Sequence, residues 1–170
     1  METLEAIFSR RSIRAFTPDR ISESDLDTII RAGAAAPSGG NAQPWIFISI
    51  TEPRHIQALR AIAPGLGGQP AAVIALCVDE SRTSTAKGSP DFLSCYDVGG
   101  AMQNMLLAAN ELGLGGCAVA SFHAQSLSTL LNLPGHINPH LLLAMGKPSI
   151  TPTAPPRREI SEIHFREKYE

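Results

Sequence analysis

Charged residues are scarce in this sequence, and neither sign of charge dominates. They make up 18% of the 170 residues, whereas about a quarter of a typical soluble protein is charged. The 14 Lys and Arg nearly balance the 16 Asp and Glu, which leaves a net charge of −2. Such a chain has no overall positive field to attract nucleic acid or an anionic membrane. The 44% hydrophobic content excludes disorder, and the expected partners are small molecules or protein.

Long apolar runs and cysteines are also few. The longest unbroken apolar run, 71–78, is far shorter than the roughly 20 residues that cross a bilayer. Residues 1–5 lack the positive and apolar regions of a secretory signal, so a cytoplasmic protein without a membrane partner is expected. Three widely spaced cysteines fit neither a disulfide framework nor a CxxC metal site; we expect reduced, mostly buried thiols at Cys77, Cys95 and Cys117.

The common catalytic motifs are missing, although near misses occur. The glycine runs 65–68 and 113–116 lack the G-x-G-x-x-G spacing, and the sequence has neither a P-loop nor a G-x-S-x-G elbow. His136 and His140 are four residues apart, but Pro139 lies between them and no HExxH glutamate accompanies them. No metal site is therefore expected, and neither a Rossmann dinucleotide site nor a phosphoryl-transfer site is supported.

Helical and strand patterns alternate along the chain without repeats, which predicts a single domain over 1–170. Ser22 and Asp25 resemble a capping box, and the apolar run 71–78 predicts a strand buried on both faces because it does not alternate. A polar loop is expected over 79–90. The predicted helices are one capped by Thr3 that ends at the basic cluster, then 22–36, 55–63, 95–112 and 125–131; the predicted strands are 45–50, 71–78, 115–122 and 140–145.

The C-terminal segment, about 147–170, is rich in proline, which predicts an extended arm. It ends in an amphipathic stretch that carries Ile160, Ile163 and Phe165. Two interpretations stay open: the arm reaches across to another subunit, or it docks as a terminus on its own surface.

A basic cluster near the N-terminus is the first candidate site. The run Arg10-Arg11-Ser12-Ile13-Arg14 places three guanidinium groups and a hydroxyl within five residues. Arginine forks match phosphate oxygens bidentately, so a phosphate monoester is the natural ligand. The alternative is a solvated helix end whose charge complements the helix dipole.

A loop of small residues, S-G-G-N-A-Q-P-W over 38–45, is the second candidate. Small residues let the backbone approach a planar ligand, and the amides of Asn41 and Gln43 could read the edge of a heteroaromatic ring. The loop could equally be a simple turn. Asp97, further along, is interpreted as the cap of the 95–112 helix, and Trp45 as a packing residue.

Taken together, the motifs resemble those of the FMN-dependent nitroreductase family. They occur in order as R-R-S-x-R, P-S-x-x-N-x-Q-P-W, D-x-G-x-x-x-Q-N, L-G-L-G and a late G-x-P before a basic pair. Each motif alone is weak, but the ordered set spans nearly the whole chain and is specific. The chain departs from many relatives at 118–121, where A-V-A-S replaces small glycines and a tryptophan.

The resemblance implies an α+β fold in which a central, mostly antiparallel sheet is flanked by helices. It also implies an intertwined homodimer with one FMN at each subunit interface. One subunit would contact the phosphate and the ribityl side of FMN, and the other subunit would supply a loop that packs along the flavin. A backbone segment would lie near flavin N5. The implied cofactor-binding residues are Arg10, Arg11, Ser12, Arg14, with Arg157 or Arg158, then Pro37, Ser38, Gly39, Asn41 and Gln43, and finally Ala120 and Ser121.

The implied activity is ping-pong hydride transfer from NADH or NADPH through flavin N5 to a nitroaromatic, a quinone or a similar small acceptor. The cofactor carries this chemistry, so no catalytic side chain is assigned. The small, polar segment 79–90 predicts an open pocket that discriminates little between acceptors. The alternatives are the same FMN site used for reductive dehalogenation or flavin breakdown, a non-catalytic FMN-binding protein, and a flavin-free structural dimer.

Overall fold

The predicted alternation of helices and strands is present in the computed structural model, which describes residues 2–83 and 93–169. Some element boundaries differ from those predicted. The helices are α1 (Thr3–Ser9), α2 (Glu23–Ala34), α3 (Pro53–Ile62), α4 (Leu93–Glu111) and α5 (Ala124–Leu130); the strands are β1 (Trp45–Ile50), β2 (Ala72–Asp79), β3 (Gly115–Val119) and β4 (Ile137–Gly146); short 3-10 turns are η1 (Gly39–Asn41), η2 (Glu80–Arg82) and η3 (Ile160–Glu162).

The four strands form one antiparallel sheet in the order β1-β2-β4-β3. The basic segment that follows α1 runs along the outer edge of β3. Ser12 forms a parallel bridge with Gly116, and the Ile13 N–H donates to the Gly116 carbonyl at 3.0 Å. The expected α+β architecture, a mostly antiparallel sheet flanked by helices, is confirmed.

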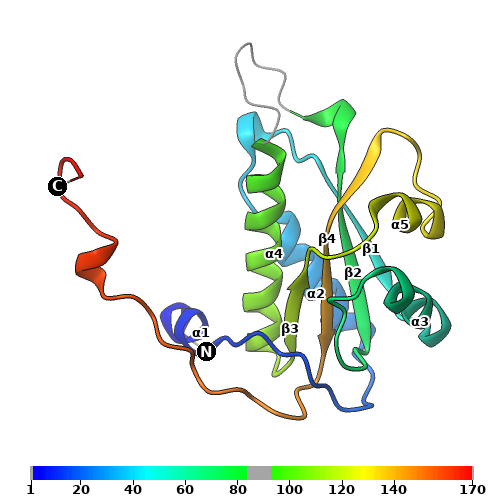
Figure 1. Cartoon of the computed structure of the whole chain (residues 1–170), viewed down its shortest axis with the longest axis horizontal. Helices are drawn as coiled ribbons and strands as arrows, with labels where there is room; N and C mark the ends of the chain where they lie inside the picture. The colour runs from blue at the N-terminus through cyan, green and yellow to red at the C-terminus, as the bar shows by residue number, and fades with distance from the viewer. Residues whose placement is uncertain (1, 84–92, 170) are drawn as a thin grey trace.

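Helices cover both faces of the sheet, with α2 and α4 on one side and α3 and α5 on the other (Figure 1). Residues of β2 alternate between the two cores: Val73 packs with the α3 and α5 residues, and Ile74 with the α2 and α4 residues. All of β2 except Asp79 is buried. The prediction that this strand is covered on both faces is therefore confirmed.

Of the three residues predicted to cap helices, one does so and two do not. Ser22 caps α2 as expected, since its Oγ accepts from the Asp25 N–H at 3.1 Å. Thr3 lies inside α1, and Glu2 precedes that helix without a side-chain cap. Asp97 was predicted to cap its helix, but α4 begins earlier and the residue lies within it.

A proline explains why β4 is longer than predicted. The strand continues through Pro139, and β2 pairs Leu76 with Leu141 but Cys77 with Pro139, so that His140 is the extra residue of a bulge. Proline cannot donate to a strand ladder and is confined to edges and bulges. The sequence argument therefore began the strand after the proline, whereas the bulge accommodates it.

The three cysteines are free thiols, and two of them are buried as expected: Cys77 and Cys117. Burial raises the pKa of the Cys77 thiol to about 11. Cys95, on α4, is exposed instead, and its Sγ lies 3.6 Å from His140 Nδ1.

The C-terminal arm leaves the body of the molecule beside α1 and carries η3 away from it (Figure 1). Every described side chain of residues 149–169 is exposed. At the other end of the molecule, the polar loop expected over 79–90 is described only as far as residue 83, beyond η2, and the rest lies outside the described residues. No helix in the described ranges has both the length and the apolar character to cross a membrane.

Candidate functional site

The basic segment presents Arg10, Ser12 and Arg14 beside the edge of β3. Side chains alternate along an extended chain, and Ile13, between the two candidate ligand residues Ser12 and Arg14, is buried with 3% exposure. Arg14 is exposed, whereas Arg10 and Ser12 are half-buried. The bridge to β3 therefore fixes the backbone that carries the three polar side chains.

Arg11 has a different role from its neighbours. One of its terminal guanidinium nitrogens donates to the carbonyls of Phe8, Ser9 and Arg10 at 2.8, 3.0 and 2.9 Å. These are the carbonyls at the C-terminal end of α1, which lack partners within the helix. The helix-end interpretation of the basic cluster thus applies to Arg11, whose charge is used within the chain.

Arg10 has a buried hydrogen-bond donor that lacks a partner among the described residues. Its Nε is buried and has no partner in the structure, and within residues 2–83 and 93–169 no acidic side chain pairs with Arg10 or Arg14. A buried donor without a partner loses the free energy of its hydrogen bonds to water. The arrangement therefore suits an anion such as a phosphate, which accepts from guanidinium groups.

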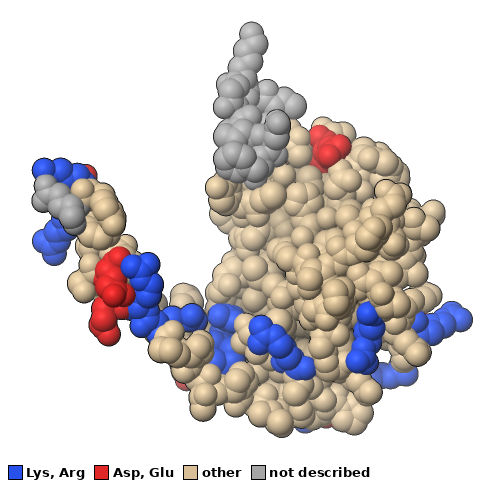
Figure 2. Space-filling model, in the orientation of Figure 1, with Lys and Arg blue, Asp and Glu red and all other residues tan. Residues whose placement is uncertain are grey.

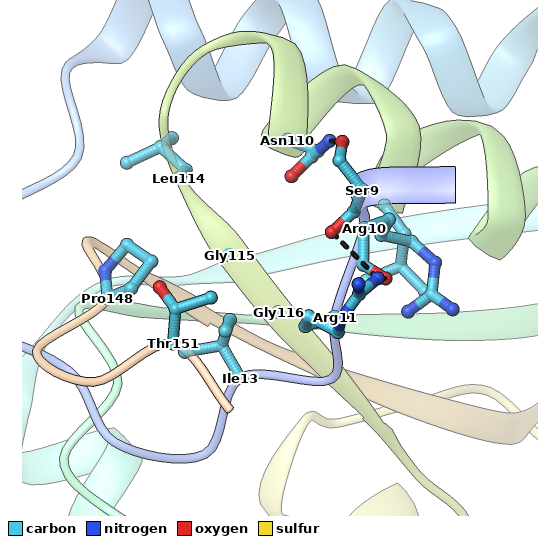
Figure 3. Close-up of a pocket in the computed structure, with 11 residues that line it drawn as sticks. Ser9, Arg10, Arg11, Ile13, Asn110, Leu114, Gly115, Gly116, Pro148 and Thr151 are labelled. Carbon is cyan, nitrogen blue, oxygen red and sulfur yellow. Dashed lines mark hydrogen bonds between the residues drawn. The ribbon is translucent and has the colours of Figure 1, made fainter. Parts of the chain in front are cut away.

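Figure 3 shows the small hollow beside these residues, about 50 Å³ in volume, at the junction of α1, α4 and β3. The Asn110 amide, near the end of α4, donates to Ser9 Oγ at 2.9 Å and holds the end of α1 in place. Pro148 and Thr151, at the start of the C-terminal arm, line the same hollow.

The small-residue loop has an unusual backbone. Gly40, Asn41 and Gln43 have φ values of +58°, +56° and +49°, in the left-handed region that non-glycine residues adopt at a cost. Ser38 Oγ accepts from the Gln43 N–H at 2.9 Å and closes the loop. The Gln43 amide donates to the Asn41 carbonyl at 3.5 Å, while the exposed Asn41 side chain makes no hydrogen bond to any described residue and faces solvent.

Asp97 attaches this loop to α4. Its carboxylate accepts from the Gly39 N–H at 3.2 Å, across 58 positions of sequence. The sequence analysis interpreted Asp97 as a helix cap and missed this contact. Asp97 begins the D-x-G-x-x-x-Q-N motif, and this position was the sequence signal for a functional role. A motif does not show which backbone group a carboxylate contacts.

Ala120 and Ser121 follow β3, which ends at Val119 and not at residue 122 as predicted. A glycine turn that the sequence analysis set aside packs against this segment. Gly65 lies so close to Ser121 Oγ that a Cβ on Gly65 would have no room. Gly68, with φ of +64°, is equally close to the carbonyl oxygen of Arg14.

The 65–68 turn therefore joins two predicted parts of the site, the basic segment and the segment after β3. The signal for it was the glycine run itself. The run does not match the dinucleotide spacing, and a close approach to two distant segments has no local pattern.

The other parts of the predicted site are not brought together within one chain. The basic segment lies at the C-terminal end of α4, where Asn110 contacts Ser9, and the small-residue loop lies near its N-terminal end, where Asp97 contacts Gly39 (Figure 1). At 1.5 Å per helical residue, the stretch between Asp97 and Asn110 spans about 20 Å.

The two basic residues near the C-terminus are also remote from Arg10. Arg158 interacts within the arm, where its Nε lies 3.4 Å from a Glu162 carboxylate oxygen and a terminal nitrogen donates to the Glu162 carbonyl at 2.8 Å. Figure 2 shows basic side chains along the arm and the lower edge of the body, while most of this face is uncharged. Arg157 is exposed on the same arm.

These features suit a protein that binds an anionic ligand beside a sheet edge. The "Nitroreductase family" sequence profile matches residues 7–75 and 57–147. The oxygen-insensitive NADPH nitroreductase of Salmonella typhimurium is 30% identical over 183 residues, which cover 99% of this chain and 75% of that protein. The chain belongs to the nitroreductase family.

Solved structures agree with this assignment. A nitroreductase family protein from Clostridium difficile superposes with a TM-score of 0.90 at 27% identity, covering 99% of this chain and 100% of that chain. The NADPH:FMN oxidoreductase from Vibrio harveyi, complexed with NAD+, gives a TM-score of 0.87 at 28% identity, covering 99% of this chain and 78% of that chain.

Proposed function

We propose that this protein is an FMN-dependent oxidoreductase that uses NADH or NADPH to reduce a nitroaromatic, a quinone or a similar small acceptor. The observation that carries the proposal is Arg10, whose buried Nε has no hydrogen-bond partner among the described residues and suits a phosphate. The names of the relatives, an NADPH nitroreductase and an NADPH:FMN oxidoreductase, support the same chemistry.

In this proposal the residues of one chain hold the phosphate end of the cofactor. Arg10 and Arg14 donate to the phosphate, and Ser12 binds the ribityl side. The 65–68 turn contacts both Ser121 and Arg14, which supports a role for the backbone of Ala120 and Ser121 near the flavin ring. When bound, FMN would supply the hydride chemistry that links the nicotinamide to the acceptor in a ping-pong reaction.

The small-residue loop of a second copy completes the site. Within one chain, Arg10 and the small-residue loop lie at opposite ends of α4. One flavin can therefore contact Arg10 and this loop only if the loop comes from a second chain. In that dimer the loop supplies Pro37, Ser38, Gly39 and Asn41 along the flavin, with Gln43 holding the loop closed.

Exposed apolar side chains support a homodimer independently of the cofactor. Leu4 and Phe8 on α1 are 65% and 73% exposed, and Ile160 and Ile163 on the arm are 69% and 53% exposed. Side chains of this kind are normally covered at subunit interfaces. We infer that the single domain ends in an arm, 147–170, that embraces the partner and brings Arg157 or Arg158 to the partner's phosphate.

Turnover of the FMN-loaded protein tests the proposal. Under anaerobic conditions, oxidation of NADH or NADPH should require FMN and should accelerate when a nitroaromatic or a quinone is added. Flavin loss that depends on oxygen would favour flavin breakdown instead, and tight FMN binding without reoxidation by any acceptor would favour a storage protein. A cytoplasmic location stays a prediction from the sequence.

The dimer has its own test. Phe8→Ser should raise the monomer fraction in sedimentation velocity and weaken FMN binding together, because the site needs two chains. His55→Ser, on the exposed side of α3, is the matched control. A Phe8→Ser variant that is monomeric and binds FMN normally would contradict the shared site.

A further inference from the structure

One face of α4 receives the end of α2 and the residues that follow it. Asn104 donates through its amide to the Ala32 carbonyl at 3.1 Å. Ala101, fully buried, forms a small apolar cluster with Ala36, just before the loop. Asp97, four positions before Ala101, lies on the same face of the helix. The chain from α2 into the small-residue loop is thus fastened at successive points along α4.

The contact between Asp97 and Gly39 lies beside the part of the loop whose backbone conformation is least favourable. Gly40, Asn41 and Gln43 all have positive φ. The loop stabilises itself through the Asn41 N–H, which donates to the Ser38 carbonyl at 2.9 Å, and through the Ser38 Oγ contact with the Gln43 N–H. These bonds shape the loop but do not position it on the rest of the molecule.

The bond from the Gly39 N–H to the Asp97 carboxylate is the hydrogen bond that positions the loop on α4. A charged acceptor makes a stronger hydrogen bond than a neutral one, and Asp97 is half-buried, which limits competition from water. A carboxylate that reaches a backbone N–H in another element fixes the position of that element, not the end of its own helix.

We propose that Asp97 is the positioning residue for the flavin-contacting loop, which it holds in binding geometry before the ligand arrives. The proposal rests on the proposed function insofar as it names the flavin as the ligand. The hydrogen bond keeps the Gly39–Asn41 turn on α4, so the backbone that carries Asn41 is held in one position. The ligand then need not order the loop, and preorganisation of this kind raises affinity.

Three variants separate the hydrogen bond from the charge. Asp97→Ala removes both, whereas Asp97→Asn keeps an oxygen acceptor of the same size without the charge. Asp79→Ala is the matched control, because the Asp79 carboxylate also accepts from a backbone N–H, that of Ser81 at 2.9 Å. Asp79 touches the loop only through its backbone N–H, which donates to the Pro44 carbonyl at 2.7 Å and is kept in the variant. Each variant is measured as the full-length protein, with and without FMN.

Amide hydrogen exchange without FMN is the first measurement, and it does not depend on the proposed function. Asp97→Ala should speed exchange at residues 38–43 by about tenfold or more, because the lost bond involves a charged group. Asp97→Asn should stay within about threefold of wild type, since an amide oxygen still accepts. Asp79→Ala should leave these amides unchanged.

The FMN dissociation constant is the second measurement. Asp97→Ala should raise it by about 10- to 100-fold, with Asp97→Asn close to wild type. Wild-type exchange in the Asp97→Ala loop, or faster exchange spread over the whole chain, would overturn the positioning role. If wild-type protein fails to bind FMN, the proposed function fails, while the exchange data still decide whether Asp97 holds the loop.

Discussion

Gly68 offers a quantitative test of how the glycine turn supports the candidate site. Its φ of +64° is one that side chains rarely adopt, and a Cβ there would press on the carbonyl oxygen of Arg14 and approach the Phe16 ring at 3.4 Å. The carbonyl belongs to the backbone and cannot rotate away. Gly68→Ala therefore combines conformational strain with a steric conflict at Arg14, a residue predicted to bind the phosphate.

The expected magnitude follows from these two terms. A left-handed alanine costs about 1–2 kcal/mol, and forcing extra volume into a packed position costs about 1–3 kcal/mol. Gly68→Ala should thus lower the free energy of unfolding by about 2–5 kcal/mol. FMN affinity should fall as well, because the substitution displaces the backbone of Arg14.

Two matched substitutions separate the terms. Gly40 has φ of +58° but open space around it, so Gly40→Ala should cost only the strain, about 1–2 kcal/mol. Gly135 has open space and an ordinary φ, so Gly135→Ala should be neutral or stabilise by up to about 1 kcal/mol.

Urea unfolding at one fixed protein concentration measures all three variants, since association would otherwise change the apparent stability. Equal losses for Gly68→Ala and Gly40→Ala, within about 0.5 kcal/mol, would refute the close approach of the turn to Arg14.

Three further predictions concern single side chains. Arg10→Ala should raise the FMN dissociation constant about tenfold or more, whereas Arg11→Ala should leave it nearly unchanged in the same titration, because Arg11 caps its own helix. A thiol reagent should modify Cys95 in the native protein and leave Cys77 protected until urea unfolds the chain, as peptide mass spectrometry would show. Burial lowers the pKa of His140, so at low pH the unfolded chain binds more protons than the folded chain. The free energy of unfolding should therefore fall between about pH 7 and pH 5. In His140→Phe it should fall less steeply over the same range.

Much of the fold could be predicted because its signals are local. The apolar run of β2 and the periodicity of α4 each specify an element without reference to the rest of the chain, and Ser22 marks a helix start by its own chemistry. The errors in the fold have local causes too. The predicted strand began after Pro139, whereas a bulge lets β4 run through this proline, and Asp97 was assigned to a helix start that lies earlier.

The candidate site was less predictable because its contacts are distant in sequence. Composition identified the basic segment, but only the folded structure shows that Arg11 bonds to the end of α1 while the buried Nε of Arg10 has no partner among the described residues. The contact between Asp97 and Gly39 joins residues with no pattern in common. The arrangement along α4, which separates the two halves of the site, is likewise a property of packing.

The visible absorbance of the purified protein, followed during anaerobic addition of NADH or NADPH, tests the central claim most directly. A flavin oxidoreductase is yellow, or becomes so with added FMN, and bleaches when the nicotinamide is added. Protein that is colourless after incubation with FMN and removal of unbound FMN by gel filtration would contradict the cofactor assignment and the roles given to Arg10, Ser12 and Arg14.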